Sequence, residues 1–124
     1  MRKIDSWTVE ALKNGEGVYC NDNTVVRVAP DGARIVELFG NKIFYINARG
    51  VVFFTLAGWN TVTTRARLNA LLSQYDIGIT SRGGVPYLRG RVFVDALKLD
   101  AGAWYKVYRF TDGSIDIVKV TTFD

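Results

Sequence analysis

The sequence contains no histidine, and it has only one cysteine and two prolines among its 124 residues. The lack of histidine removes the most common general base and metal ligand, and with it every Ser-His or Cys-His nucleophile pair. Cys20 has no second cysteine with which to form an internal disulfide or a zinc site. No pattern in the sequence predicts that two acidic residues are buried side by side, so there is no candidate acid/base dyad. We therefore expect a non-catalytic protein that uses no metal and no other cofactor.

Long hydrophobic runs are also missing. The longest, residues 51–57, has the length of a strand and falls far short of the ~20 residues that a membrane helix needs. Arg2 and Lys3 begin the chain, but no apolar segment of the signal-peptide type follows them. A single free cysteine is typical of a reducing compartment. We therefore expect a cytoplasmic protein that does not bind membranes.

The spacing of turn signals predicts a meander of short strands. Glycine, proline and asparagine clusters recur every eight to twelve residues or so, which is the rhythm of antiparallel hairpins. The first clusters are Asn21–Asn23, Pro30–Gly32, Gly40-Asn41 and Ala48–Gly50. At 48% hydrophobic residues the composition excludes a disordered chain, and the length fits one domain.

One main helix is predicted over about residues 61–75. Leu68, Leu71, Leu72 and Tyr75 have the spacing of a single helical face. The candidates for its N-cap are Asn60, Thr61 and Thr63. A shorter helix is predicted over residues 6–13, with Ser6 or Asp5 as its cap.

The C-terminal part of the chain predicts a β-hairpin. Residues 104–110 and 115–120 flank Asp112-Gly113, a sequence that favours a type I′ turn. Residues 90–99 are ambiguous, because Val92–Val94 favour a strand and Asp95–Leu99 favour a turn of helix. We predict a single α+β domain over residues 1–124: an antiparallel β-meander packed on the main helix, with the C-terminal hairpin completing or extending the sheet.

Two of the predicted strands, residues 43–46 and 51–54, are apolar at both alternating positions. A strand with one face in water would alternate between apolar and polar residues. We therefore expect both of their faces to be covered, one by the main helix and the other by C-terminal strands. A second copy of the chain is the alternative cover, so a homodimer stays open.

Positive charge is concentrated in the middle of the chain. The net charge is +4, but residues 41–91 alone carry seven basic side chains and one acidic side chain. Six of these seven are arginines, whose planar guanidinium suits phosphate. We predict that Arg65 and Arg67 on the helix, together with Arg82, Arg89 and Arg91 around a glycine-rich hairpin, converge on an anionic ligand. The alternative is an ordinary solvated surface. Trp59, just before the helix, is interpreted as a packing anchor.

Two segments carry a resemblance to a group of small, uncharacterised tailed-phage proteins. They are residues 36–43 (VELFGNKI) and 56–72 (LAGWNTVTTRARLNALL). The pattern they resemble is a Leu-x-Gly-Asn-x-Ile strand followed by a Gly-Trp-x-Thr-x-Thr-Thr-x-x-Arg-Leu-Asn helix start. The resemblance extends over roughly residues 24–80. It implies a phage origin and a β-meander followed by a helix, and it implies no activity.

Together these observations predict a non-catalytic phage accessory protein of the host cell cytoplasm. In the leading hypothesis, it binds nucleic acid or another phosphate-bearing ligand through the five central arginines. In a variant of this hypothesis, the same arginines form a pocket that sequesters a nucleotide or small anion, rather than a groove that binds a nucleic acid. The alternative is a factor that binds and inhibits a host protein, which an exposed apolar patch would favour.

Overall fold

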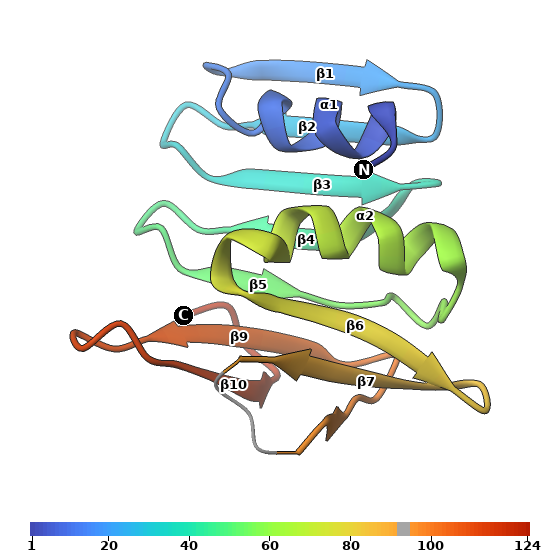
Figure 1. The fold of residues 1–124 in the computed structure, drawn as a ribbon. Helices are drawn as coiled ribbons and strands as arrows, with labels where there is room; N and C mark the ends of the chain where they lie inside the picture. The colour runs from blue at the N-terminus through green and yellow to red at the C-terminus, as the bar shows by residue number, and fades with distance from the viewer. Residues whose placement is uncertain (92–94) are drawn as a thin grey trace.

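A seven-stranded antiparallel sheet forms the body of the protein (Figure 1). The structure, a computed structural model, describes residues 1–91 and 95–124. The sheet has the order β1-β2-β3-β4-β5-β9-β10, and β6-β7-β8 form a separate three-stranded antiparallel sheet. The strands are β1 (Gly17–Asn21), β2 (Thr24–Val28), β3 (Arg34–Leu38), β4 (Asn41–Ile46), β5 (Val52–Phe54), β6 (Ile77–Arg82), β7 (Val85–Gly90), β8 (Leu97–Lys98), β9 (Trp104–Arg109) and β10 (Ile115–Val120).

The α+β prediction is confirmed, with its main helix and its C-terminal hairpin. Helix α2 (Val62–Leu72) continues into a 3₁₀ turn, η1 (Ser73–Tyr75), so the two together cover the predicted segment. The Thr61 hydroxyl caps α2 by accepting a hydrogen bond from the backbone N–H of Thr64, at 3.2 Å. The β9–β10 hairpin extends the large sheet by pairing with β5.

Three local predictions need correction. Helix α1 (Lys3–Ala11) begins before Asp5 and Ser6, so neither residue is its N-cap. The β9–β10 turn is not of type I′, because Gly113 has a positive φ of 87° while Asp112 does not. Leu97 and Lys98 form strand β8 rather than a turn of helix. The predicted strand at Val92–Val94 lies outside the described residues.

The helices lie on one face of the large sheet (Figure 1). A row of buried side chains joins them to it. In the strand register each member of the row is the cross-strand partner of the next: Val26, Val36, Phe44, Phe54 and Tyr105. Leu68, Leu71 and Leu72 of α2 are buried in the same core, as their spacing predicts. Burial of each such side chain contributes about 1.5–3 kcal/mol.

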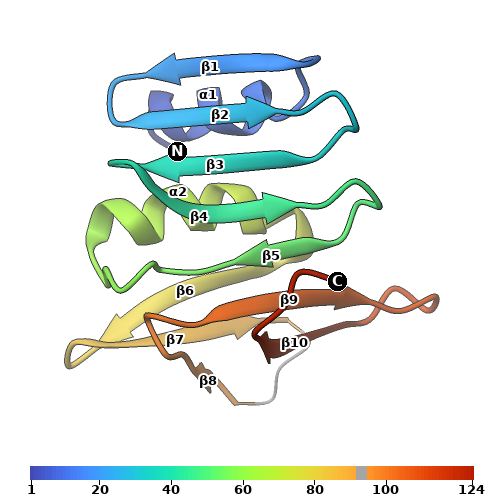
Figure 2. The ribbon, with the colours of Figure 1, turned by 180° about the vertical axis from the view of Figure 1, so that it is seen from behind.

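No helix of the described residues lies on the opposite face of the sheet, and the C-terminal residues cover part of that face. Figure 2 shows the chain turning back across this face after β10. The Phe123 ring makes edge contacts with Tyr45, Phe53 and Trp104, at centroid distances of 5.6, 5.2 and 5.0 Å. The Asn47 side chain donates a hydrogen bond to the carbonyl of Phe123. The second face of β4 and β5 is thus covered from within the chain, by a terminal segment rather than by strands.

A buried ion pair links the two helices. The Arg67 guanidinium of α2 donates to the Asp5 carboxylate of α1, and both side chains are at least 95% buried. It also donates to Thr24 Oγ1 at 3.0 Å and to Asn23 Oδ1 at 3.3 Å, at the start of β2. Asp5 is therefore an ion-pair partner within the first turn of α1. One guanidinium fixes both helices against the sheet.

Asn69 joins α2 to the three-stranded sheet. Its side-chain amide donates to the carbonyl of Ile79 at 3.0 Å and accepts from the Ile79 N–H at 2.6 Å. The side chain thereby occupies the place of a neighbouring strand along β6. A Cβ at Gly78 would lie 3.4 Å from Asn69 Oδ1, which is ordinary van der Waals contact, so the two elements pack closely here. The small sheet is therefore held against α2.

Removing one partner of the buried ion pair should be strongly destabilising. Asp5→Ala leaves the Arg67 charge buried without its counter-ion, and we expect the free energy of unfolding to fall by about 3–5 kcal/mol. Urea denaturation measures the change. The exposed pair of Glu10 and Lys13 provides the control, since Glu10→Ala should cost less than about 1 kcal/mol. Equal losses in the two variants would contradict the role given to Arg67.

Loss of the Asn69 amide should also destabilise the protein. Asn69→Ala leaves the N–H and C=O of Ile79 without their partner, which should cost about 1–3 kcal/mol. Hydrogen exchange at the Ile79 amide should accelerate in the same variant. Gln74→Ala, which removes an exposed amide just beyond the same helix, serves as the control. Unchanged exchange at Ile79 would show that Asn69 does not hold the small sheet.

Candidate functional site

The five predicted contact arginines do not gather at one place. Arg67 is the clearest correction, because it is 1% exposed and its guanidinium binds Asp5, Thr24 and Asn23. It is part of the core and presents no surface to a ligand. The distribution of charge in the sequence does not indicate that Arg67 is buried, since its partner carboxylate lies 62 residues away in the sequence.

Arg65 lies at the start of α2 and is turned toward the preceding loop. Its Nη1 donates to the backbone carbonyl of Asn60 at 3.1 Å and to Asn60 Oδ1 at 2.6 Å. The Asn60 amide donates in turn to Ser81 Oγ and to the carbonyl of Gly84, both at 3.1 Å. Arg65 is therefore connected through Asn60 to the tip of the β6–β7 hairpin.

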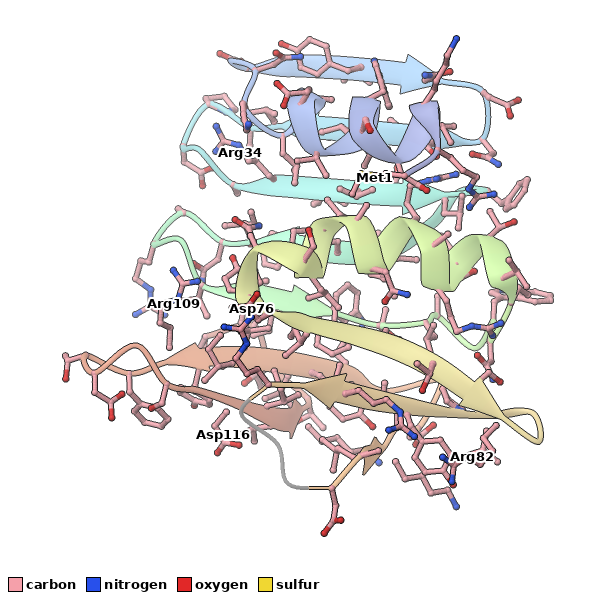
Figure 3. All side chains as sticks on the ribbon, in the orientation of Figure 1. Met1, Arg34, Asp76, Arg82, Arg109 and Asp116 are labelled. Carbon is pink, nitrogen blue, oxygen red and sulfur yellow. The ribbon has the colours of Figure 1, made fainter. Side chains whose placement is uncertain are left out.

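The β6–β7 hairpin places two of the predicted arginines on one face. Alternation along the strands turns Ile77, Ile79 and Leu88 inward, where they are buried. Arg82 and Arg89 have the opposite parity and are exposed. In Figure 3 the hairpin lies between the labelled Arg82 and α2. The outer face of the small sheet is therefore basic.

A cavity of about 390 Å³ opens on this outer face. Its lining residues are Arg82, Tyr87, Arg89, Asp95 and Ala96. Arg89 Nε donates to Thr80 Oγ1 at 3.3 Å, beside the cavity. Arg91 is exposed at the end of β7 and is not among the lining residues. The structure thus brings together Arg82 and Arg89 out of the five predicted contacts.

This face also includes two residues that were not predicted from the sequence, Tyr87 and Lys98. Tyr87 lines the cavity, and Lys98 of β8 is its cross-strand partner, so Lys98 adds a third positive charge to the same surface. The strand β8 has only two residues, which is too short for a recognisable alternation. Tyr87 and Arg89 are two residues apart on β7 and so point to the same face of the strand, and that spacing was the available signal.

Two arginines outside the predicted five, Arg27 and Arg109, have protein partners. Arg27 donates to the Glu37 carboxylate at 2.9 Å, and this bond raises the pKa of the guanidinium. Arg109 lies over the Tyr75 ring at 4.8 Å. Burial raises the pKa of Tyr75, and the charge of Arg109 opposes that rise. By contrast, within residues 1–91 and 95–124, no ion pair within 4.0 Å involves Arg82 or Arg89.

A second cavity, also of about 390 Å³, lies where the β3–β4 turn meets the loop before α2. Its lining residues are Leu38, Phe39, Asn41, Ile43, Leu56, Ala57, Trp59, Thr61 and Thr64. Trp59 is 59% exposed, so its interpretation as a packing anchor is wrong. Phe39 is 69% exposed on the facing turn. The ring of Trp59 borders an open apolar cavity and is not part of the core.

Neither a candidate metal centre nor a membrane-spanning helix occurs in the described part of the chain. No group of three or more potential metal-ligating side chains occurs among these residues. Neither α1 nor α2 is long and apolar enough to cross a membrane.

Comparison with known proteins places the chain in a family. No significant match was found among curated proteins or among solved structures. The model of one protein family, described as Kyanoviridae Gp96 protein, matches residues 1–115. The match includes both helices and both candidate cavities, and it agrees with the phage resemblance of residues 24–80. The chain therefore belongs to the Kyanoviridae Gp96 protein family, a family of phage proteins.

Proposed function

We propose that this phage protein is a non-catalytic binder of phosphate-bearing ligands, and that its ligand is a single-stranded nucleic acid. The observation that carries the proposal is the cavity on the outer face of the small sheet. Arg82 and Arg89 line it from neighbouring strands, with the ring of Tyr87 between them in sequence. Arg65 and Arg67, which the sequence also suggested, have no part in this site.

The chemistry of the lining suits a phosphate. Each guanidinium is a planar fork of N–H donors that matches the oxygens of a phosphate group. Asp95 lines the same cavity, so the lining carries two positive charges and one negative charge. This modest excess suits one or two phosphate groups within the cavity. It also makes binding sensitive to salt.

Tyr87 and Lys98 favour a nucleic acid over a free phosphate. An aromatic ring on a sheet surface offers a face on which a base can stack, whatever its sequence. Lys98 pairs with Tyr87 across the strands, which extends the positive surface beyond the cavity. A chain of nucleotides can use the cavity, the ring and the lysine together, whereas a single phosphate can use only the arginines. Bases of a single strand are free to stack, and those of a duplex are not.

Exchange of both cavity arginines should abolish most of the binding. We expect Arg82→Ala/Arg89→Ala to weaken binding of a fluorescent oligothymidylate about tenfold or more at low salt, measured by anisotropy. The slope of log K against log salt should become shallower by about 1.4, because each phosphate of a single strand that an arginine neutralises contributes about 0.7 to that slope.

Arg49→Ala is the matched control for this experiment. Arg49 is exposed in the β4–β5 turn, and its loss removes one charge from the same central segment of the chain. We expect its affinity to stay within about twofold of the wild type, because salt screens the interaction of an exposed charge with a distant ligand. An equal loss in the Arg49 variant, or no binding by the wild type, would overturn the proposal. Competition by inorganic phosphate as strong as that by unlabelled oligothymidylate would reduce the ligand to a phosphate alone.

A further inference from the structure

The cavity beside Trp59 is a second candidate site, and its lining differs from that of the first cavity in its lack of charged side chains. None of its nine lining residues is ionisable. Leu38, Ile43 and Leu56 are buried and form its apolar floor. Phe39 and Trp59 are exposed side chains that contribute to its lining. A large ring that borders a cavity while more than half exposed leaves apolar surface in water, which a partner can cover.

The backbone on both sides of this cavity is held in an unusual conformation. Phe39 and Ala57 both have left-handed backbones, with φ of 51° and 55°. Residues other than glycine adopt this conformation at a cost, and bulky ones seldom do. Each is followed by a glycine that also has a positive φ, Gly40 and Gly58. The two tight turns fix the direction of the backbone from which Phe39 and Trp59 project.

The two threonine hydroxyls of the cavity lining are already hydrogen-bonded. The hydroxyls of Thr61 and Thr64 lie 2.9 Å apart and bond to each other. Within the described residues, no buried side-chain nitrogen or oxygen lacks a hydrogen-bond partner. A nucleobase in this cavity could pair with the exposed Asn41 amide, but each further polar group of its edge that stays unpaired would cost about 1–3 kcal/mol. An apolar side chain meets no such cost, so the lining favours an apolar group over a base.

A cationic side chain is bonded to the loop that lines the cavity. Asn60 lies in the chain between two lining residues, Trp59 and Thr61, and it accepts a hydrogen bond from Arg65 at 2.6 Å. The first turn of α2 contains no acidic residue, and its positive dipole end lies at this loop. The neutral cavity thus has a cationic side chain next to it. An occupant that carries negative charge beside its apolar group would match both features.

We propose that this cavity docks a protein partner through one large apolar side chain flanked by acidic residues. The cavity receives the apolar side chain between Phe39 and Trp59, in the manner of an anchor residue at the centre of an interface. Arg65 attracts the flanking carboxylates. This site is independent of the nucleic-acid site, since no residue lines both cavities.

The test uses short capped peptides as probes and the indole N–H resonances of the isotope-labelled protein as the readout. The chain has three tryptophans, Trp7, Trp59 and Trp104, and single Trp→Phe variants assign their signals. We expect the peptide Glu-Glu-Phe-Glu-Glu to shift the Trp59 signal in a saturable way. Glu-Glu-Ala-Glu-Glu and Lys-Lys-Phe-Lys-Lys should each bind about tenfold more weakly or worse.

Two variants locate the peptide on the protein. Phe39→Asn removes one wall of the cavity but keeps a residue that tolerates the left-handed backbone, and it should weaken binding about tenfold. Val62→Ala is the control, because Val62 is 71% exposed at the start of α2 and does not line the cavity. Arg65→Gln should remove the preference for acidic over basic flanks. Arg82→Ala/Arg89→Ala should bind the peptide as the wild type does, which separates this test from that of the nucleic-acid site.

Three results would overturn the proposal. The first is equal binding of the Phe and Ala peptides, which would show that the apolar anchor is not recognised. The second is saturation by adenosine at a lower concentration than by the acidic peptide, which would make the cavity a base-binding site. The third is a concentration-dependent dimer in sedimentation that Phe39→Asn abolishes, because a second copy of the chain would then be the occupant. Thermal unfolding of each variant confirms that it is folded before binding is measured.

Discussion

The buried pair of Arg67 and Asp5 is the constraint on which the arrangement of the helices depends. Removing two charges from water is costly, and the cost is recovered only where the partners are held together with their remaining hydrogen bonds satisfied. Here the guanidinium satisfies these conditions with Asp5 of α1 and with Thr24 and Asn23 beside β2. These contacts exist only when α1, α2 and β2 all occupy their native places. The pair thus specifies one docking of the helices on the sheet, while the apolar row beneath supplies the larger share of the stability.

The two faces of the large sheet have different covers, and this asymmetry explains where the candidate sites lie. The helices protect one face, and Phe123 covers the aromatic centre of the other. The small sheet is attached to α2 through Asn69, so its own inner face is buried and its outer face is free to carry charge. Basic and aromatic side chains can remain exposed there because they take no part in closing the core.

Asn60 connects the surroundings of the two cavities. Its side chain bonds to Arg65 and to the tip of the β6–β7 hairpin, and the residues on either side of it line the apolar cavity. The hairpin that carries Arg82 is therefore tied to the loop that carries Trp59. This small phage protein thereby presents both a basic surface and an apolar cavity. The loop that contains Asn60 is hydrogen-bonded to the hairpin that carries the basic surface, and the same loop lines the apolar cavity.

Local periodicity in the sequence determined the elements of this fold. The leucine spacing of residues 68–72 identified α2, turn residues separated the strands of the meander, and the apolar parity of residues 43–46 and 51–54 required covers on both faces. These signals act over a few residues, so one chain is enough to see them.

What only the tertiary structure decided was which side chains are exposed. Arg67 and Arg65 are two residues apart on one helix, yet Arg67 is buried because Asp5, far away in sequence, is there to pair with it. Trp59 is exposed, and Arg82 and Arg89 share a cavity with Tyr87, because strand register and helix docking place them so. Burial of a charge or a ring depends on partners brought together by folding, and no local pattern records them.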